Sequence, residues 1–150
     1  MPRVELLGAA LLFTTTLALV PAADAQAAAG CGTRLSDWQG ATYTGILTGE
    51  DGGLHSVTVR IPGDTVTVMT DTHSWEARDM AVELHDDTVT WGSSVPDRGF
   101  TQTLRTPLCA NGSTAVVAAE FTAERNTLAG GSTAFGWIVR TSDGPSTTTA

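Results

Sequence analysis

The chain has 150 residues, of which 41% are hydrophobic, and its 16 acidic and 8 basic residues give a formal net charge of −8. Nucleic acids and anionic membranes attract basic proteins, so this charge excludes both as expected partners. Beyond an export signal, the length allows one modest hydrophobic core and is too short for two ordinary domains.

The first segment, residues 1–29, differs in kind from the rest of the chain. A basic residue near the start precedes an apolar stretch over residues 6–20, and a run of alanines follows. This order predicts a secretory signal peptide, cleaved after Ala25, Ala27 or Ala29, and therefore a secreted protein. The apolar stretch is shorter than the roughly 20 residues of a membrane-spanning helix, so we expect no transmembrane segment.

Cys31 and Cys109 are the two cysteines of the chain. An even number of cysteines behind an export signal predicts one disulfide bond between them. Residues 28–31 also resemble a bacterial lipobox, and in that alternative Cys31 would carry a lipid anchor. The anchor would leave Cys109 as a lone thiol in an oxidising compartment, so we favour the disulfide.

From Thr42 onward, apolar and polar residues alternate with the period of half-buried strands. Short turns rich in Gly, Asp and Asn separate eight such runs, which makes consecutive strands antiparallel neighbours. We therefore predict an all-β fold, an antiparallel up-and-down meander of about eight strands closed into a small barrel, with a β-sandwich as the alternative. The predicted strands are 42–48, 55–61, 65–70, 74–85, 88–91, 100–106, 114–123 and 133–140.

Two boundaries complete the predicted organisation. The barrel domain is expected to cover residues 30–141. Residues 142–150 are small and polar, which predicts a disordered tail.

The fourth run changes phase within itself. Trp75 lies on the odd positions, whereas the later apolar residues, beginning with Met80, lie on the even ones. A slip of one residue moves every side chain to the other face of a sheet, so we predict a β-bulge near Arg78 and Asp79. Without a bulge, Glu76 and Arg78 would point inward as a charge pair, at a desolvation cost.

In a meander, alternate loops lie at the same end of the barrel. Cys31 precedes the first strand and Cys109 follows the sixth, so both cysteines fall at the end where the first strand begins, which we call the bottom. The top end then carries the loops 49–53, 71–73, 92–99 and 125–132. Ligand sites of barrels usually lie among the loops of an open end, so the top end is the candidate site.

Three aromatic side chains from consecutive strands are expected to cluster beneath the top loops. They could floor a pocket for an apolar or sugar-like ligand, although packing within the core is the commoner role of such residues. A buried amide needs either a neighbouring strand or a ligand as its partner. The candidate ligand-binding residues are Trp75, Trp91, Phe100, Gln102, His55 and His73.

Other chemistry leaves no specific pattern in the chain. His55, His73 and Asp71 lack the spacing of a zinc site, so no metal or other cofactor is predicted. A nucleophile elbow of the form Gly-x-Ser-x-Gly is missing from the sequence, and no catalytic residue is predicted. Trp137, between Phe135 and Val139, is predicted to lie in the core.

Trp38, Gln39 and Gly40 stand before the first strand of this tryptophan-containing, secreted meander. In architecture the chain resembles avidin-type and lipocalin-type barrels, and the resemblance implies an up-and-down barrel. The ligand-binding residues of those families do not match one by one, so no biotin or lipid site is carried over.

Three functions follow as hypotheses. The first is a secreted, non-enzymatic β-barrel that binds a small molecule or an extracellular protein through its top end. The second is an extracellular inhibitor or effector that presents loop 92–99 to a protein partner. The third is a small secreted hydrolase. The sequence predicts no oligomeric state.

Overall fold

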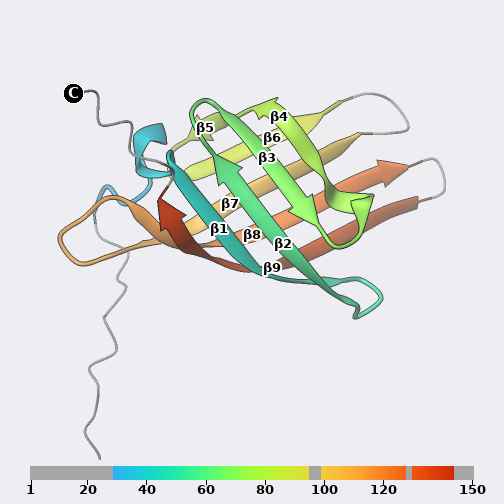
Figure 1. The fold of residues 1–150 in the computed structure, drawn as a ribbon. Helices are drawn as coiled ribbons and strands as arrows, with labels where there is room; N and C mark the ends of the chain where they lie inside the picture. The colour runs from blue at the N-terminus through green and yellow to red at the C-terminus, as the bar shows by residue number, and fades with distance from the viewer. Residues whose placement is uncertain (1–28, 95–98, 128–129, 144–150) are drawn as a thin grey trace, which may run out of the picture.

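The structure, a computed structural model, describes residues 29–94, 99–127 and 130–143 (Figure 1). The predicted signal peptide up to residue 28, the centre of loop 92–99 and residues 144–150 of the predicted tail lie outside these ranges. Within them, no helix has the length and apolar character needed to cross a membrane.

The described residues form a single antiparallel sheet of nine strands with two short 3₁₀ helices. The order of the strands in the sheet is β4-β3-β2-β1-β9-β8-β7-β6-β5. The elements are η1 (Leu35–Asp37), β1 (Ala41–Gly49), β2 (Leu54–Ile61), β3 (Thr65–Thr70), η2 (His73–Trp75), β4 (Ala77–Ala81), β5 (Glu83–His85), β6 (Thr88–Ser93), β7 (Phe100–Cys109), β8 (Val116–Thr127) and β9 (Gly130–Asp143).

The sheet curls into a nearly closed up-and-down barrel, as predicted, rather than the alternative sandwich (Figure 1). The first strand, β1, pairs with β2 on one side and with the last strand, β9, on the other. This pairing joins the two ends of the meander, and the edges of the sheet are β4 and β5. The last strand also continues to Asp143, two residues beyond the predicted end of the domain.

The ninth strand arises because the predicted run 74–85 is divided. Its beginning forms η2, its middle forms β4, and Val82 separates β4 from β5. The first part pairs with the preceding strand, β3, and the last part pairs with the following strand, β6. The run therefore changes partners at Val82, which leaves a seam in the barrel wall between β4 and β6.

The predicted bulge lies in β4. Val66 is opposite Met80 and Val68 is opposite Ala77, so three steps along β4 match two steps along β3. Asp79 lies within this bulge, and its φ of 48° is in the left-handed region. Arg78 is 80% exposed, so the alternative with an inward Glu76–Arg78 pair is wrong.

Substitutions at Asp79 are expected to separate the backbone strain from the side chain. A β-branched residue tolerates positive φ poorly, so Asp79→Val should reduce the free energy of unfolding by about 1–2 kcal/mol. Asp79→Gly relieves the strain but loses the weak contact with Thr67 Oγ1, so its free energy should change by less than about 1 kcal/mol. Urea denaturation of both variants measures this, and equal losses would contradict the assignment of the bulge.

The predicted strand 133–140 lies within β9, but the prediction that Trp137 lies in the core is wrong. Phe135, Trp137 and Val139 are 56%, 48% and 51% exposed, whereas Ala134 and Ile138 are buried. Gly136 shares the inward phase, and a Cβ there would lie 2.1 Å from the carbonyl oxygen of Ile46 on β1. A side chain at Gly136 would therefore collide with the backbone of β1, and the inward positions of β9 hold Ala134, Gly136 and Ile138 in place of the aromatic residues.

Large side chains from around the barrel fill that interior. Tyr43, Phe121 and Leu104 are fully buried, and the Tyr43 hydroxyl donates to the carbonyl oxygen of Val116 at 3.2 Å. At the bottom, Trp38 is also fully buried, and its Nε1 donates to the carbonyl oxygen of Gly32 at 2.8 Å. The segment before β1 thus packs into the barrel as a plug.

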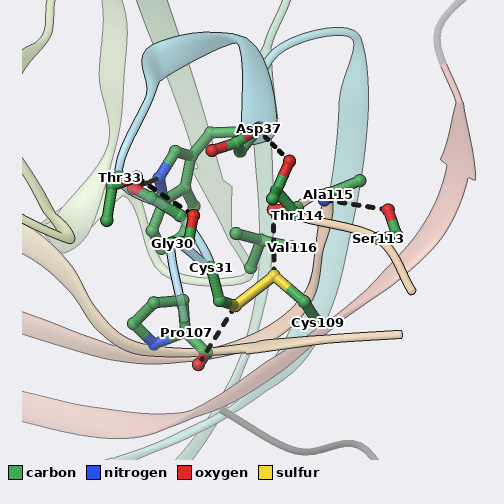
Figure 2. The surroundings of a disulfide bond; sticks show 12 residues. Gly30, Cys31, Thr33, Asp37, Pro107, Cys109, Ser113, Thr114, Ala115 and Val116 are labelled. Atoms are coloured by element: carbon green, nitrogen blue, oxygen red, sulfur yellow. Dashed lines mark hydrogen bonds between the residues drawn. A yellow bond between two sulfur atoms is a disulfide. The ribbon is translucent and has the colours of Figure 1, made fainter. Parts of the chain in front are cut away.

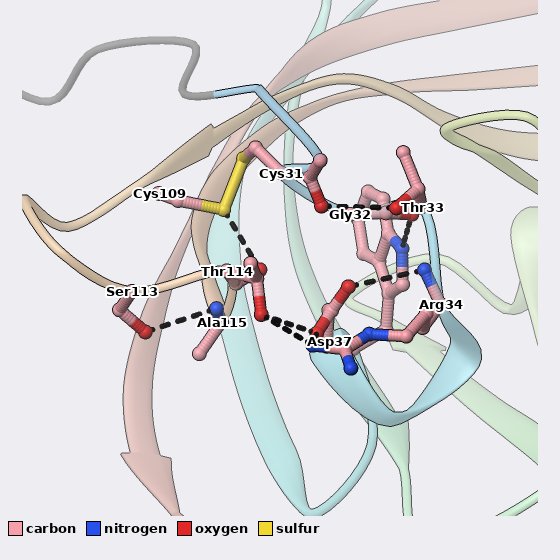
Figure 3. A network of polar contacts seen from close by, with 11 residues as sticks. Cys31, Gly32, Thr33, Arg34, Asp37, Cys109, Ser113, Thr114 and Ala115 are labelled. Carbon is pink, nitrogen blue, oxygen red and sulfur yellow. Dashed lines mark hydrogen bonds and ion pairs between the residues drawn. A yellow bond between two sulfur atoms is a disulfide. The ribbon is translucent and has the colours of Figure 1, made fainter.

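A disulfide and a polar network hold this plug in place. Cys31 and Cys109 form the predicted bond, with their Cα atoms 5.8 Å apart (Figure 2). Beside it, the buried Asp37 accepts from the backbone N–H of Arg34 at 3.0 Å and from Thr114 Oγ1 at 2.7 Å (Figure 3). These contacts tie the N-terminal segment to the end of β7 and to the β7–β8 connection. The disulfide occupies the Cys31 sulfur, which the alternative lipid anchor would require.

Candidate functional site

Three of the predicted top loops meet around one pocket of about 400 Å³. Its walls come from the β1–β2 turn, the segment around η2 and the facing ends of β8 and β9, and these segments are far apart in the sequence. The pairing of β1 with β9 brings the first and the last of these together. The lining residues are Gly49, Glu50, Asp51, His55, Thr72, Ser74, Trp75, Arg125, Ser132 and Thr133.

The β1–β2 turn supplies two carboxylates. The side chain of Asp51 accepts from the backbone N–H of Gly53 at 2.9 Å, which fixes the turn locally. Glu50 Oε1 accepts from Thr133 Oγ1 at 2.9 Å and so connects this turn to β9. Arg125, near the end of β8, is a basic residue of the same lining. The pocket thus offers both acceptors and donors of charge-assisted hydrogen bonds.

An Asp–His pair stands at the pocket wall. His55 Nδ1 lies 3.3 Å from Asp71 Oδ1, and the other carboxylate oxygen of Asp71 accepts from the backbone N–H of Ser56 at 3.3 Å. Ser74 also lines the pocket, but within the described residues no hydrogen bond joins it to His55. The arrangement orients the imidazole and lacks the serine–histidine contact of a nucleophilic triad.

A buried relay of hydrogen bonds positions the floor of the pocket. Trp91 Nε1 donates to Gln102 Oε1 at 2.6 Å, and Gln102 Nε2 donates to the backbone carbonyl of Trp75 at 2.7 Å. Gln102 and Trp91 are 1% and 2% exposed, while Trp75, at 8%, reaches the pocket. The relay connects β6, β7 and η2, so the core of the barrel holds the indole of Trp75 at the open end.

One hydroxyl of the lining lacks a partner. Thr72 Oγ1 is the single buried side-chain nitrogen or oxygen without a hydrogen bond in the described part of the chain. Buried polar groups in proteins are almost always satisfied, and an exception needs an explanation, such as a bound molecule. Thr72 belongs to the lining of the top pocket, so a molecule bound there is the partner that we test for this hydroxyl.

The structure separates the six candidate ligand-binding residues. His55 and Trp75 line the top pocket, and Gln102 lies buried beneath it. Trp91 and Phe100 instead border a second hollow of about 380 Å³ at the seam between β4 and β6. His73 is 90% exposed and bonds Glu76 through Nδ1 at 2.8 Å.

Sequence reasoning did not single out several lining residues, among them Arg125, Thr133 and Thr72. Arg125 and Ser132 bound the predicted loop 125–132, whose position at the top was the signal that could have found them. The prediction of a long loop is wrong, because β8 continues to Thr127 and β9 begins at Gly130. Among the described residues, no group of three or more His, Cys, Asp or Glu side chains could hold a metal ion.

A wider hollow of about 640 Å³ lies at the bottom, beside Cys31, Pro107 and the β5–β6 turn. Its two acidic residues, Asp86 and Asp87, are both exposed, Asp86 to 88%. The lining includes no aromatic side chain and no buried polar group that converges on a ligand. The top pocket, although smaller, combines both features and is the better candidate.

No protein-family model, curated protein or solved structure matches this chain. The resemblance to avidin-type and lipocalin-type barrels therefore rests on architecture alone. Any function must be argued from the pocket itself.

Proposed function

We propose that this protein is an extracellular, non-enzymatic binding protein that takes a small, sugar-like ligand in the top pocket. The observation that carries the proposal is the composition of the pocket wall. The lining combines the acidic residues Glu50 and Asp51, the basic residue Arg125 and several serine and threonine residues with one tryptophan, Trp75. Sugar hydroxyls both donate and accept hydrogen bonds, and sugar rings stack against aromatic side chains, so this set matches a polyhydroxylated ligand.

Two further features support the proposal. The pocket volume of about 400 Å³ falls within the range of small-molecule sites. The disulfide is compatible with the extracellular compartment that the predicted signal peptide implies. The runner-up, presentation of loop 92–99 to a protein partner, falls largely on residues outside the described ranges.

Binding of the labelled, purified protein to a printed array of mono- and oligosaccharides tests the proposal. We expect a small set of related glycans to bind, and titration calorimetry with the best of them gives a dissociation constant. A lack of binding to every arrayed glycan would contradict the proposal.

The Thr72→Val variant should show whether the array hit occupies the top pocket. Valine keeps the shape and removes an unsatisfied buried hydroxyl, so the free energy of unfolding should stay constant or rise by up to about 1 kcal/mol. The lost hydrogen bond to the glycan should weaken binding about tenfold, which corresponds to about 1.4 kcal/mol. Thr103→Val, on the outer face of β7, is the matched control and should bind normally; equal affinities of the two variants would place the ligand elsewhere.

A further inference from the structure

The strands β2, β1 and β9 are neighbours in the barrel wall (Figure 1). Exposed hydrophobic side chains gather on the outer side of these three strands. Six large hydrophobic side chains are exposed in the described part of the chain, and five of them lie on these three strands. Two of the five are aromatic. We call this surface the outer apolar face, and it consists of Ile46 (54% exposed), Leu54 (69%), Phe135 (56%), Trp137 (48%) and Val139 (51%).

The strand register makes the outer apolar face continuous. Trp137 on β9 is directly opposite Ile46 on β1. Phe135 is opposite Thr48, and Thr48 is opposite Leu54 on the next strand, β2. Directly opposite residues in a sheet have Cβ atoms about 4.5–5.5 Å apart, so these side chains form one patch and not scattered single residues.

The face is uncharged in a protein of net charge −8. Its other outward positions on β1 and β9 are threonines, among them Thr44, Thr48 and Thr133. Two acidic residues of β8 lie at the rim, Glu120 opposite Trp137 and Glu124 opposite Thr133. Arg105 binds Glu120 through two contacts of 3.0 and 3.1 Å. These hydrogen bonds from Arg105 lower the pKa of the Glu120 carboxyl, so the rim carries a closed ion pair at neutral pH.

We infer that the outer apolar face is the interface between two copies of this chain, related by a two-fold axis near Trp137 and Ile46. Two acidic molecules repel each other over most of their surfaces, and a neutral face lets them meet without opposing like charges. A two-fold axis places β9 of one copy against β1 and β9 of the other, in the manner of face-to-face sheet packing.

The area agrees with such an interface. The five side chains expose on the order of 500 Å² of apolar surface, because an aromatic residue alone has about 150–250 Å². A standard interface buries about 800 Å² per partner, which the flanking threonines can complete. None of the five side chains belongs to the lining of the top pocket, so their burial in a dimer would remove no lining residue from either pocket.

Sedimentation velocity of the purified native protein from about 1 to about 100 µM tests the inference. We expect a dimer with an interface of this area to assemble in that range of concentration. We expect the weight-average mass to rise from monomer to dimer. Trp137→Glu should weaken the dimer at least about 100-fold because it buries an unpaired charge. Met69→Glu adds the same charge at a 40% exposed site on β3 and should leave the dissociation constant within about threefold.

Tryptophan quenching supplies a second readout in the native protein. Trp38, Trp75 and Trp91 are at most 8% exposed, so acrylamide should quench chiefly Trp137. Quenching should fall as the protein dimerises. If circular dichroism shows that Trp137→Glu is unfolded, Ile46→Ser replaces it as the test substitution in the outer apolar face. A native protein that stays monomeric throughout, a dimer unaffected by substitutions in the face, or quenching independent of concentration would each overturn the inference.

Discussion

Replacing Cys31 and Cys109 together by serine is expected to lower the free energy of unfolding by about 2–5 kcal/mol and the melting temperature by about 10–20 °C. The bond closes a loop of 78 residues, and long loops gain most from closure because the unfolded chain loses most freedom. It also ties the Trp38 plug to the end of β7. Thermal unfolding followed by circular dichroism measures the loss.

The reduced native protein supplies the matched control. A reductant should lower the melting temperature of the native chain to that of the double serine variant and leave the variant unchanged. A double variant as stable as the oxidised protein would mean that the packing of Trp38 and the hydrogen bonds of Asp37 hold the N-terminal segment without the bond.

The second large effect is expected at the centre of the buried relay. Gln102→Leu keeps most of the volume but leaves the indole N–H of Trp91 and the backbone carbonyl of Trp75 without partners. Each unsatisfied buried group costs about 1–3 kcal/mol, so the free energy of unfolding should fall by about 2–5 kcal/mol. Urea denaturation measures this loss. The η2 segment should also loosen, so affinity for the array hit should fall although Gln102 does not line the pocket.

Two comparisons isolate the relay from a general effect of removing an amide. Gln39→Leu, at a half-exposed position after η1, should change the free energy by less than about 0.5 kcal/mol. In a double-mutant cycle with Trp91→Phe, the two losses should overlap by about 1 kcal/mol or more, because both variants remove the same hydrogen bond. Strictly additive losses would show that the bond between Trp91 and Gln102 contributes little.

The position of the site could be predicted, but most of its composition could not. The count of loops in a meander placed residues 49–53, 71–73 and 125–132 at one end, and His55 and Trp75 do line the pocket there. Thr72, Arg125 and Thr133 carry no sequence pattern of their own. Arg125 and Thr133 become neighbours of Glu50 because β1 pairs with β9, a contact between the two ends of the meander, whereas Thr72 reaches the pocket from the segment between β3 and η2.

The local chemistry of the chain was enough to determine most of its strands and turns, the bulge at Asp79 and the disulfide, but not the division of the run 74–85 or the extent of β8 and β9. Alternation with period 2 marks a strand, and turn residues mark its ends, since both depend on near neighbours in the sequence. Cys31 and Cys109 could be assigned to one end because a meander reverses direction at every turn.

Only the tertiary structure decided which face of each strand is inside and where the barrel wall is open. The period of a strand is the same whichever face is buried, so the sequence allows Trp137 to be assigned to the core on its size. In the structure, Ala134, Gly136 and Ile138 face the interior of the barrel and Trp137 faces outward. The break at Val82 likewise depends on strand pairing, because β4 pairs with β3 whereas β5 pairs with β6. Both outcomes depend on the volume and closure of the whole barrel, which no local stretch of sequence contains.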